Sequence, residues 1–352
     1  MTTAYFCLHE QIHQKFQFSR IMSLKVTNLS KRYDDNWVLR NVSLDIEECE
    51  VFGIFGATGA GKSTLIRLIS GSENCDGGTI QFDSSDITTL SCDERNFLFP
   101  KLTNDSFWKS LFNTEKKSQL ADGEGQVLAL EDALQKADSI LLLDDSFCYM
   151  DRLLRLENYE KLHRTVDEKK LIVVIAGNDF NEMMKLCERI AVLHEGEIKQ
   201  IGTPREIYES PNSVAVARIT GRNNLIEARR LTSSEAELPE FQTVIGEHGL
   251  FTKRIEKKIE KIEKNLPAAL NEKVTLAIRP EHISISFGAS FPEDNLLKAQ
   301  IIDIKFHGAT TLIRLDSNGL ILEALVLRLV GLNIGDECMV GLPPDRILVL
   351  TN

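Results

Sequence analysis

Apolar runs of strand length alternate with segments of helical spacing along the first part of the chain. Mostly apolar runs predict strands at residues 50–55, 140–143 and 171–176, followed by a strand pair at 190–193 and 198–202. Helical spacing of apolar residues predicts helices at residues 64–70, 159–166 and 180–189. Runs without polar alternation are typical of strands that are buried on both faces. The pattern therefore predicts an α/β domain with a mostly parallel sheet.

The pattern changes at about residue 222, where short strands and turns replace the alternation of strands and helices. Strands are predicted within residues 275–282, 299–306, 310–315 and 338–342. Ile255, Ile259 and Ile262 share one helical face in Lys/Glu-rich sequence, which favours a short amphipathic helix capping the β-domain over a partner-binding helix. We expect an α/β domain over residues 23–221 and a small all-β domain over residues 222–352.

The first 22 residues differ from both domains. Residues 1–20 are polar and aperiodic, and regular patterning begins only at residues 24–29, just after Met22. No continuous apolar region of the kind that a signal peptide needs occurs there. We expect residues 1–22 to be a disordered extension, or translation to begin at Met22.

Composition excludes several classes of protein. A formal net charge of −11 argues against a nucleic-acid binder that is held by phosphate contacts. The seven cysteines are scattered and form no C-x-x-C pair, which favours a reducing cytosol and predicts no cysteine metal site. The longest apolar runs are too short to span a bilayer. The chain is therefore expected to be soluble, with at most a peripheral place at a membrane.

One loop fills every fixed position of the phosphate-binding pattern G-x-x-x-x-G-K-[ST]. Its residues are Gly56, Ala57, Thr58, Gly59, Ala60, Gly61, Lys62, Ser63 and Thr64. The glycines let backbone N–H groups approach phosphate oxygens, Lys62 supplies a positive charge, and the Ser63 hydroxyl is a ligand for Mg²⁺. A predicted strand precedes the loop and a predicted helix follows it, as the motif requires. The sequence predicts a nucleoside triphosphate site.

Two acidic residues, Asp144 and Asp145, directly follow the predicted strand at residues 140–143. A buried strand that ends in Asp delivers a carboxylate to the edge of a parallel sheet. Proteins with this phosphate loop organise Mg²⁺ with such an Asp. Asp144 is therefore the second predicted ligand of Mg²⁺.

With these motifs the chain resembles the ATP-binding subunit of an ABC transporter. The resemblance is to the importer type with a C-terminal TOBE-like β-domain, in the polyamine, sugar and iron importer group. It runs from Leu24 to the C-terminus and is best over residues 24–86, 141–151, 188–221 and 274–349. The segment Ala277-Ile278-Arg279-Pro280-Glu281-His282 is similar to a characteristic strand of the β-domain. Tyr33 falls where the family stacks an aromatic ring on adenine; the alternative is an ordinary strand-end tyrosine.

The resemblance implies a fold, cofactors and partners. The fold would be an α/β P-loop domain followed by a small OB/TOBE-like barrel, and the cofactors would be ATP and Mg²⁺. Members of the family form homo- or heterodimers of ATP-binding subunits and dock on an integral-membrane permease, with no nucleic acid. The expected location is cytoplasmic, at the inner face of the cell membrane.

Several family motifs are altered. Counting back from Asp144 places Leu120-Ala121-Asp122-Gly123-Glu124 at the Leu-Ser-Gly-Gly-Gln signature, which normally contacts the γ-phosphate of the partner's nucleotide. A shifted register through Gly125 and Gln126 would disturb the spacing to Asp144. The segment from Glu94 to Leu120, which in the family builds the helical subdomain that grips the permease, is also shorter than usual.

Three further positions also differ from the family's residues, each in a way that favours weaker hydrolysis. Asp145 stands where the family has a glutamate that polarises water, and a shorter side chain displaces the carboxylate. Asn178 replaces a histidine and does not titrate near neutral pH. Counting back from residues 97–100 places Glu94 at the family's nucleotide-sensing glutamine, with the strand before it deleted.

Two functions remain open from these residues. In the first, the chain is an importer subunit that binds Mg-ATP and hydrolyses it weakly, with Asp145 as the general base. In the second, it is a nucleotide-binding regulatory or structural subunit that does not hydrolyse ATP. A soluble, non-transport ABC ATPase is disfavoured by the C-terminal β-domain.

Overall fold

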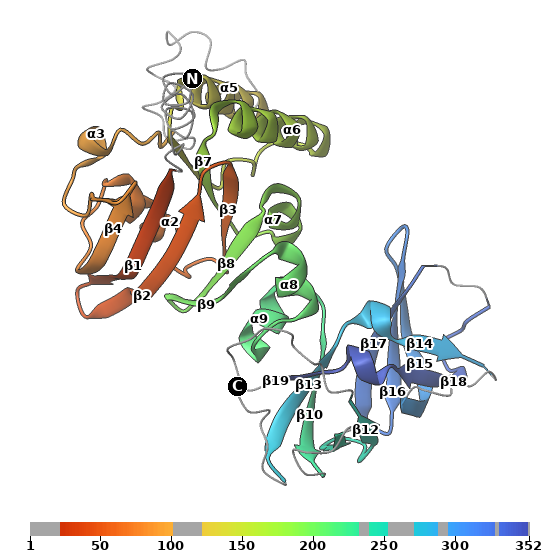
Figure 1. Ribbon diagram of the computed structural model, residues 1–352. Coiled ribbons are helices and arrows are strands. Elements are labelled where there is room, and N and C mark those ends of the chain that lie inside the picture. The colour runs from red at the N-terminus through yellow and green to blue at the C-terminus, as the bar shows by residue number, and fades with distance from the viewer. Residues whose placement is uncertain are drawn as a thin grey trace, which may run out of the picture. The chain divides into compact units, whose positions relative to one another are not determined.

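The computed structural model describes residues 22–100, 122–231, 239–252, 271–287, 295–327 and 331–350. Contacts divide the chain into two compact units, Met1–Pro204 and Arg205–Asn352 (Figure 1). This division lies ahead of the expected domain boundary at residues 221 and 222, which remains a prediction. The expected extension before Met22 and the expected helix around Ile259 lie outside the described residues.

The first unit contains a five-stranded sheet with the order β6-β7-β3-β8-β9. Its strands are β3 (Glu50–Phe55), β6 (Ile140–Asp144), β7 (Ile172–Gly177), β8 (Arg189–His194) and β9 (Glu197–Gly202). Strands β6, β7, β3 and β8 pair in parallel, and β9 pairs antiparallel to β8. Every residue of β3 and β7 is buried, because both faces of these central strands are covered.

A second sheet in this unit was not predicted. It is wholly antiparallel, with the order β2-β1-β4-β5. Its strands are β1 (Ser23–Tyr33), β2 (Asn36–Glu47), β4 (Gly77–Phe82) and β5 (Ser85–Asp86). The expectation of a mostly parallel sheet is therefore not confirmed for the α/β domain as a whole, which combines a mixed sheet with an antiparallel one. Buried and exposed positions alternate along part of β2, as expected for a strand with one face toward the core.

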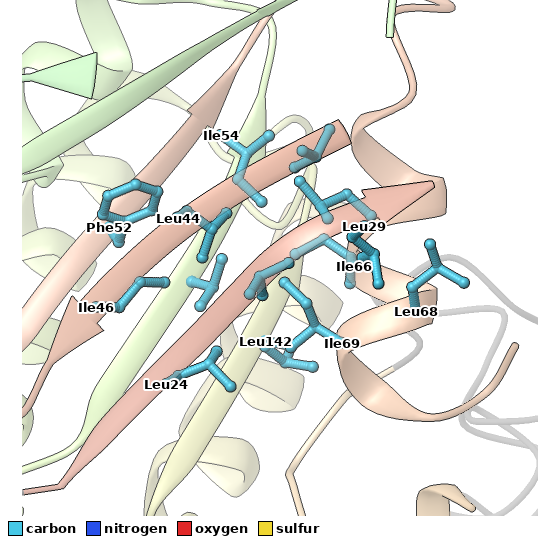
Figure 2. Close-up of a cluster of buried hydrophobic side chains, with 14 of the residues drawn as sticks. Leu24, Leu29, Leu44, Ile46, Phe52, Ile54, Ile66, Leu68, Ile69 and Leu142 are labelled. Atoms are coloured by element: carbon cyan, nitrogen blue, oxygen red, sulfur yellow. The ribbon is translucent and has the colours of Figure 1, made fainter. Parts of the chain in front are cut away.

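The main core of this unit joins the two sheets to helix α2 (Lys62–Ser70). Figure 2 shows Leu24 and Leu29 of β1, Leu44 and Ile46 of β2, Phe52 and Ile54 of β3, and Ile66 of α2 gathered in one cluster. The remaining helices are α3 (Cys92–Arg95), α5 (Asp122–Lys136), α6 (Arg152–Lys169) and α7 (Phe180–Leu186). The phosphate loop therefore connects a fully buried strand to a helix that is anchored in the core.

The chain after α3 lies beside β6. Leu98 forms a parallel bridge with Leu141; its N–H donates to Ile140 O at 3.0 Å, and Leu142 N–H donates to Leu98 O at 2.9 Å. This bridge follows Glu94, and between β5 and Glu94, where the structure describes every residue, there is no strand.

The second unit carries two antiparallel five-stranded sheets, with the orders β12-β11-β10-β13-β19 and β14-β18-β15-β16-β17. The first consists of β10 (Asn224–Arg230), β11 (Glu240–Thr243), β12 (Gly249–Phe251), β13 (Lys273–Ile278) and β19 (Leu348–Leu350). The second consists of β14 (Ser284–Ser286), β15 (Asn295–Phe306), β16 (Thr311–Ser317), β17 (Leu320–Val326) and β18 (Glu337–Leu342). One apolar cluster draws residues from both sheets. The expected C-terminal all-β domain is therefore present.

Two short helices contribute to this unit: α8 (Pro204–Glu209), whose residues from Arg205 onward belong to it, and α9 (Val214–Ile219). Two 3₁₀ turns, Pro280–His282 and Pro344–Arg346, also belong to it. The predicted strand over residues 275–282 ends at Ile278, because Pro280 begins a 3₁₀ turn.

The side chain of Arg279 explains the motif at the end of β13. It is 4% exposed, donates to the carbonyl oxygens of Arg222 (3.0 Å) and Tyr208 (2.7 Å), and lies 3.8 Å from the centre of the Tyr208 ring. Tyr208 Oη in turn donates to Glu281 at 2.5 Å. Arg279 and Glu281 therefore fasten α8 to the β-domain.

Candidate functional site

The phosphate loop and Asp144 lie at the same edge of the five-stranded sheet. Asp144 is level with Ala176 of β7, and Ala176 is level with Ile54 of β3. Since these strands are parallel, the chain leaves β3 into the loop at the same edge at which β6 ends, with β7 between the two strands. Ligands of open α/β sheets bind outside the carboxyl ends of the strands. The sequence-predicted residues are thus brought to the edge where such a site is expected.

Two glycines of the loop adopt backbone conformations that side chains disfavour. Gly61 has φ 106°, and a Cβ there would lie 2.7 Å from Leu39 Cδ2 and 2.9 Å from the Val38 carbonyl oxygen. Gly59 has φ 84°, and a Cβ there would meet no described atom within 4 Å. Gly61 is the N-cap of α2 and contributes no side-chain cap. The first N–H groups of α2 therefore face the loop, in the arrangement that binds phosphate.

The side chain of Lys62 folds back against the phosphate loop. It is 7% exposed, and its Nζ donates to the carbonyl oxygens of Gly56 at 2.9 Å and Ala57 at 3.0 Å. Burial lowers the pKa of Lys62, while the nearby carboxylates of Asp145 and Asp144 act in the opposite direction. The ammonium thus lies between the loop and the acidic end of β6, where an anion would be attracted.

Asp144 combines burial with an unused oxygen. Burial raises the pKa of its carboxyl group; a hydrogen bond with the Ser63 side chain lowers it, the neighbouring Asp145 raises it, and Lys62 lowers it. Its Oδ1 is buried and has no hydrogen-bond partner among the described residues. A buried carboxylate oxygen beside a serine hydroxyl matches the oxygen ligands that Mg²⁺ prefers. Asp144 and Ser63 therefore fit the metal that the sequence predicted.

The two predicted catalytic residues lie close to the same strand end. The Asp145 N–H donates to Ala176 O at 3.1 Å, and Asn178 follows directly after β7. Both side chains are exposed. Asp145 has φ 46°, a left-handed conformation that Asp tolerates better than most residues do. Their assignment as catalytic residues remains a prediction.

A third carboxylate at this edge was not predicted. Glu182, in α7, accepts a hydrogen bond of 2.7 Å from Tyr159 Oη, and its Oε2 lies 4.0 Å from where a Cβ on Gly177 would sit. Burial raises the pKa of Glu182, the hydrogen bond from Tyr159 lowers it, and the charge of Asp145 raises it. The available signal in the sequence was an acid in the first turn of the helix that follows Asn178.

The signature region is only partly described, because Leu120 and Ala121 lie outside the described residues. Helix α5 begins at Asp122, and a Cβ on Gly123 would lie 2.7 Å from the Tyr149 carbonyl oxygen. Buried Gln126 accepts a 2.9 Å hydrogen bond from the Tyr149 N–H. The start of α5 is thus fixed to the segment that follows Asp145.

Glu94 does not lie where the sequence analysis placed it. Its carboxylate accepts hydrogen bonds from the N–H and the hydroxyl of Ser91, which caps α3. Leu98 is level with Leu141, near the start of β6, and Glu94 precedes it in a chain that runs parallel to β6. Glu94 therefore lies toward the opposite end of β6, and its assignment to the nucleotide-sensing position is wrong.

A glycine-rich loop between a parallel strand and a helix, with a carboxylate at the end of a nearby strand, defines a P-loop nucleotide-binding protein. Comparison with known families gives two matches: a model described as ABC transporter over residues 39–106, and one described as TOBE domain over residues 276–350.

Relatives of known name extend the likeness along the chain. The spermidine/putrescine import ATP-binding protein PotA of Thermotoga maritima is 31% identical over 297 residues, which is 75% of this chain and 77% of the relative. PotA of Hahella chejuensis is 28% identical over 321 residues, 82% of this chain and 85% of the relative. The sulfate/thiosulfate import ATP-binding protein CysA of Bacillus cereus is 32% identical over 273 residues, 65% and 76% of the two chains.

The chain therefore belongs to the importer-type ATP-binding proteins of ABC transporters, with a C-terminal TOBE domain. None of the helices within the described ranges is long and apolar enough to cross a membrane.

Proposed function

We propose that this importer subunit binds Mg-ATP through residues 56–64 and hydrolyses it weakly. The buried Oδ1 of Asp144, which has no hydrogen-bond partner among the described residues, carries the proposal. The Ser63 side chain and the Lys62 ammonium lie near enough to affect the pKa of this carboxyl group. In this proposal Lys62 and the N–H groups of α2 bind the β- and γ-phosphates, Ser63 and Asp144 hold Mg²⁺, and Tyr33 stacks on adenine. Bound Mg²⁺ would neutralise phosphate charge.

Weak turnover follows from the two catalytic positions. Asp145 carries a carboxylate that can accept a proton from water, but its side chain is one methylene shorter than the family's glutamate. Misplacement by about 1 Å can cost about 10²-fold in rate. Asn178 donates a hydrogen bond but does not titrate near neutral pH. We infer a slow chemical step with Asp145 as the general base.

The partners are proposed from the family. Two ATP-binding subunits, identical or different, would pair in a head-to-tail arrangement. This pair would dock on a membrane permease from the cytoplasmic side. No nucleic acid would take part. The named relatives import different cargo, polyamines in some and sulfate or thiosulfate in another. Polyamine import is the first cargo to test, because the two PotA relatives cover more of this chain than the CysA relative does.

The second candidate is a subunit whose bound ATP holds an assembly together without hydrolysis. Asp145 and Asn178 favour it, and so does the sequence change to Ala121 and Asp122 in the signature. In the family the signature of one subunit contacts the nucleotide that the other subunit binds. Pairing with a subunit whose motifs are unaltered would therefore still leave an altered residue of this chain at each of the two nucleotide sites. A soluble ABC ATPase outside transport is disfavoured by the TOBE domain.

Single-turnover hydrolysis of Mg-ATP at high protein concentration distinguishes the two candidates. Lys62→Ala removes the phosphate-binding charge and should abolish ATP binding. Lys136→Ala is the matched control, because Lys136 is exposed and pairs with Asp132 on the surface of α5. Phosphate release above the Lys62→Ala background supports the importer subunit that hydrolyses ATP weakly. ATP binding without release, repeated with a permease partner, supports the non-hydrolytic subunit, and no ATP binding by the wild type would overturn both.

A further inference from the structure

The hydroxyl of Tyr33 is tethered to the helix that follows the phosphate loop. Tyr33 is the last residue of β1 and is 40% exposed. Its Oη donates to Glu73 Oε2 at 2.7 Å and accepts from Arg67 Nη2 at 3.4 Å. A strand-end tyrosine needs neither contact to remain in place, since water can satisfy an exposed hydroxyl. The two contacts instead fix the orientation of the ring.

Arg67 continues this connection to the phosphate loop. Its Nε lies 3.2 Å from Glu73 Oε2, and its Nη2 donates to the Thr64 hydroxyl at 3.1 Å. Thr64 is the last residue of the predicted phosphate-binding loop. Hydrogen bonds therefore link Tyr33 to that loop through Glu73 and Arg67.

Lys31 lies against the Tyr33 ring. Its Nζ is 5.5 Å from the ring centre, donates to Asn74 O at 2.7 Å and lies 3.4 Å from Glu73 Oε1. An ammonium over an aromatic face is attracted by the ring. The face that Lys31 covers is not available to a flat ligand, so a stacking base has the opposite face of Tyr33 left to it.

The charges of the network match these roles. Burial raises the pKa of Glu73, but the hydrogen bonds from Tyr33 and Arg67 and the charge of Lys31 outweigh it, and the net pKa is lowered. Glu73 is thus ionised at neutral pH, and the Tyr33 hydroxyl is the donor to it. The same contacts raise the pKa of Arg67.

We propose that Glu73 and Arg67 are positioning residues for the base of a bound nucleotide, which they hold through the Tyr33 hydroxyl. The base stacks on the face of Tyr33 opposite Lys31, and the Arg67–Thr64 contact keeps that ring in register with the phosphate loop. This inference rests on the proposed nucleotide site and adds the residues that orient its base platform.

The test compares Mg-ATP with Mg-tripolyphosphate, which has the phosphates but no base, on the full chain by calorimetry. Tyr33→Ala should weaken ATP by about ten-fold, because stacking of a base on an aromatic ring contributes at roughly that level. Tyr33→Phe removes the tether, and Glu73→Gln weakens it by replacing the charged acceptor with a neutral amide oxygen and by removing the ion pair with Arg67. Each keeps the ring and should weaken ATP by about three- to five-fold. None of the three should change tripolyphosphate affinity.

The double variant Tyr33→Phe/Glu73→Gln should lose no more than either single variant, because both act on one hydrogen bond. Glu197→Gln, in the surface pair with Lys199, is the matched control and should change neither ligand. Equal losses for ATP and tripolyphosphate in Glu73→Gln, additive losses in the double variant, or unchanged ATP affinity in Tyr33→Ala would each overturn the inference. In all three cases binding of both ligands by the wild type leaves the proposed nucleotide site intact. Failure of the wild type to bind either ligand would overturn that site as well.

Discussion

Glu94 and Ser91 cap helix α3 for each other. The carboxylate of Glu94 lies 2.8 Å from the backbone nitrogen of Ser91 and 2.7 Å from its hydroxyl oxygen. These hydrogen bonds lower the pKa of Glu94, so the side chain is ionised in its capping role. The contact is the capping box that commonly begins helices, and it commits Glu94 to local structure.

Replacement of Glu94 should therefore affect stability and not nucleotide binding. Glu94→Ala removes the acceptor for the Ser91 N–H and should shift the urea midpoint slightly downward, with ATP affinity unchanged. Glu94→Gln, which can still accept from Ser91, is the matched variant and should shift the midpoint less. A large fall in ATP affinity at an unchanged midpoint would show that Glu94 senses the nucleotide after all.

Arg95 is a buried cation whose described hydrogen-bond partners are backbone carbonyls. It is 6% exposed and donates to the oxygens of Leu68 and Ile69 at the end of α2 and of Thr88 and Leu90 in the loop between β5 and α3. Arg95→Met would fill much of the volume and leave those acceptors unpaired, so we expect a loss of about 3 kcal/mol in the free energy of unfolding.

Arg205→Met is the control for Arg95, because Arg205 is 83% exposed in its side chain and pairs with Glu209 one helical turn away. Its cost should stay below about 1 kcal/mol. Urea denaturation measures both variants, and equal costs for the two would contradict the role assigned to Arg95.

Asp145→Glu should raise single-turnover hydrolysis if side-chain length limits the chemical step. The expected gain approaches the roughly 10²-fold that a misplacement of about 1 Å costs. The gain should come with a loss of about 1 kcal/mol in stability, because residue 145 has φ 46° and glutamate tolerates that conformation less well than aspartate. Asp145→Asn keeps the backbone preference and removes the base, so it should be stable and inactive. No change in rate for Asp145→Glu would assign the slow step to another position.

Glu182 makes stability depend on pH in a defined direction. Burial raises its pKa above the ordinary glutamate value of 4.5, so the folded state holds its proton more strongly than the unfolded state. The stabilisation is complete below pH 4.5 and is lost as the pH rises through the folded pKa. Glu182→Gln cannot titrate and can still accept from Tyr159 Oη. The variant should therefore gain stability over the wild type as the pH rises from 4.5 to 7, measured by urea titration at each pH.

A constant difference between wild type and Glu182→Gln across this pH range would show that Glu182 is not the titrating group. Tyr159→Phe provides the complementary measurement. It removes the hydrogen bond that lowers the Glu182 pKa, so the loss of stability should move to higher pH.

The phosphate loop and Asp144 were predictable because their signals are local. Each is a short motif attached to a strand whose apolar run marks it as buried, and parallel strands bring their carboxyl ends together. The antiparallel sheet was missed because β1, β2 and β4 carry polar residues and lack a continuous apolar run, and because β4 pairs with β1 from a distant part of the chain.

The position of Glu94 was predicted wrongly and the burial of Glu182 was not predicted, both for a different reason. The position of Glu94 depends on which residue of the following segment pairs with β6, and the bridge between Leu98 and Leu141 joins residues that are distant in sequence. The burial of Glu182 arises where α6 and α7 pack, through Tyr159. Neither contact leaves a periodic pattern in the sequence.

The bridge at Leu98 also hinders association between molecules through strand β6. Strand β6 is apolar from Ile140 to Leu143 and lies at the margin of its sheet, and an open margin of this kind can pair with the same strand of another molecule. Leu98 occupies the hydrogen-bonding groups of Ile140 and Leu142 on that side. The single bridge at Leu98 thus hinders intermolecular sheet growth along this margin of β6, and its loss would free the strand for pairing with another molecule.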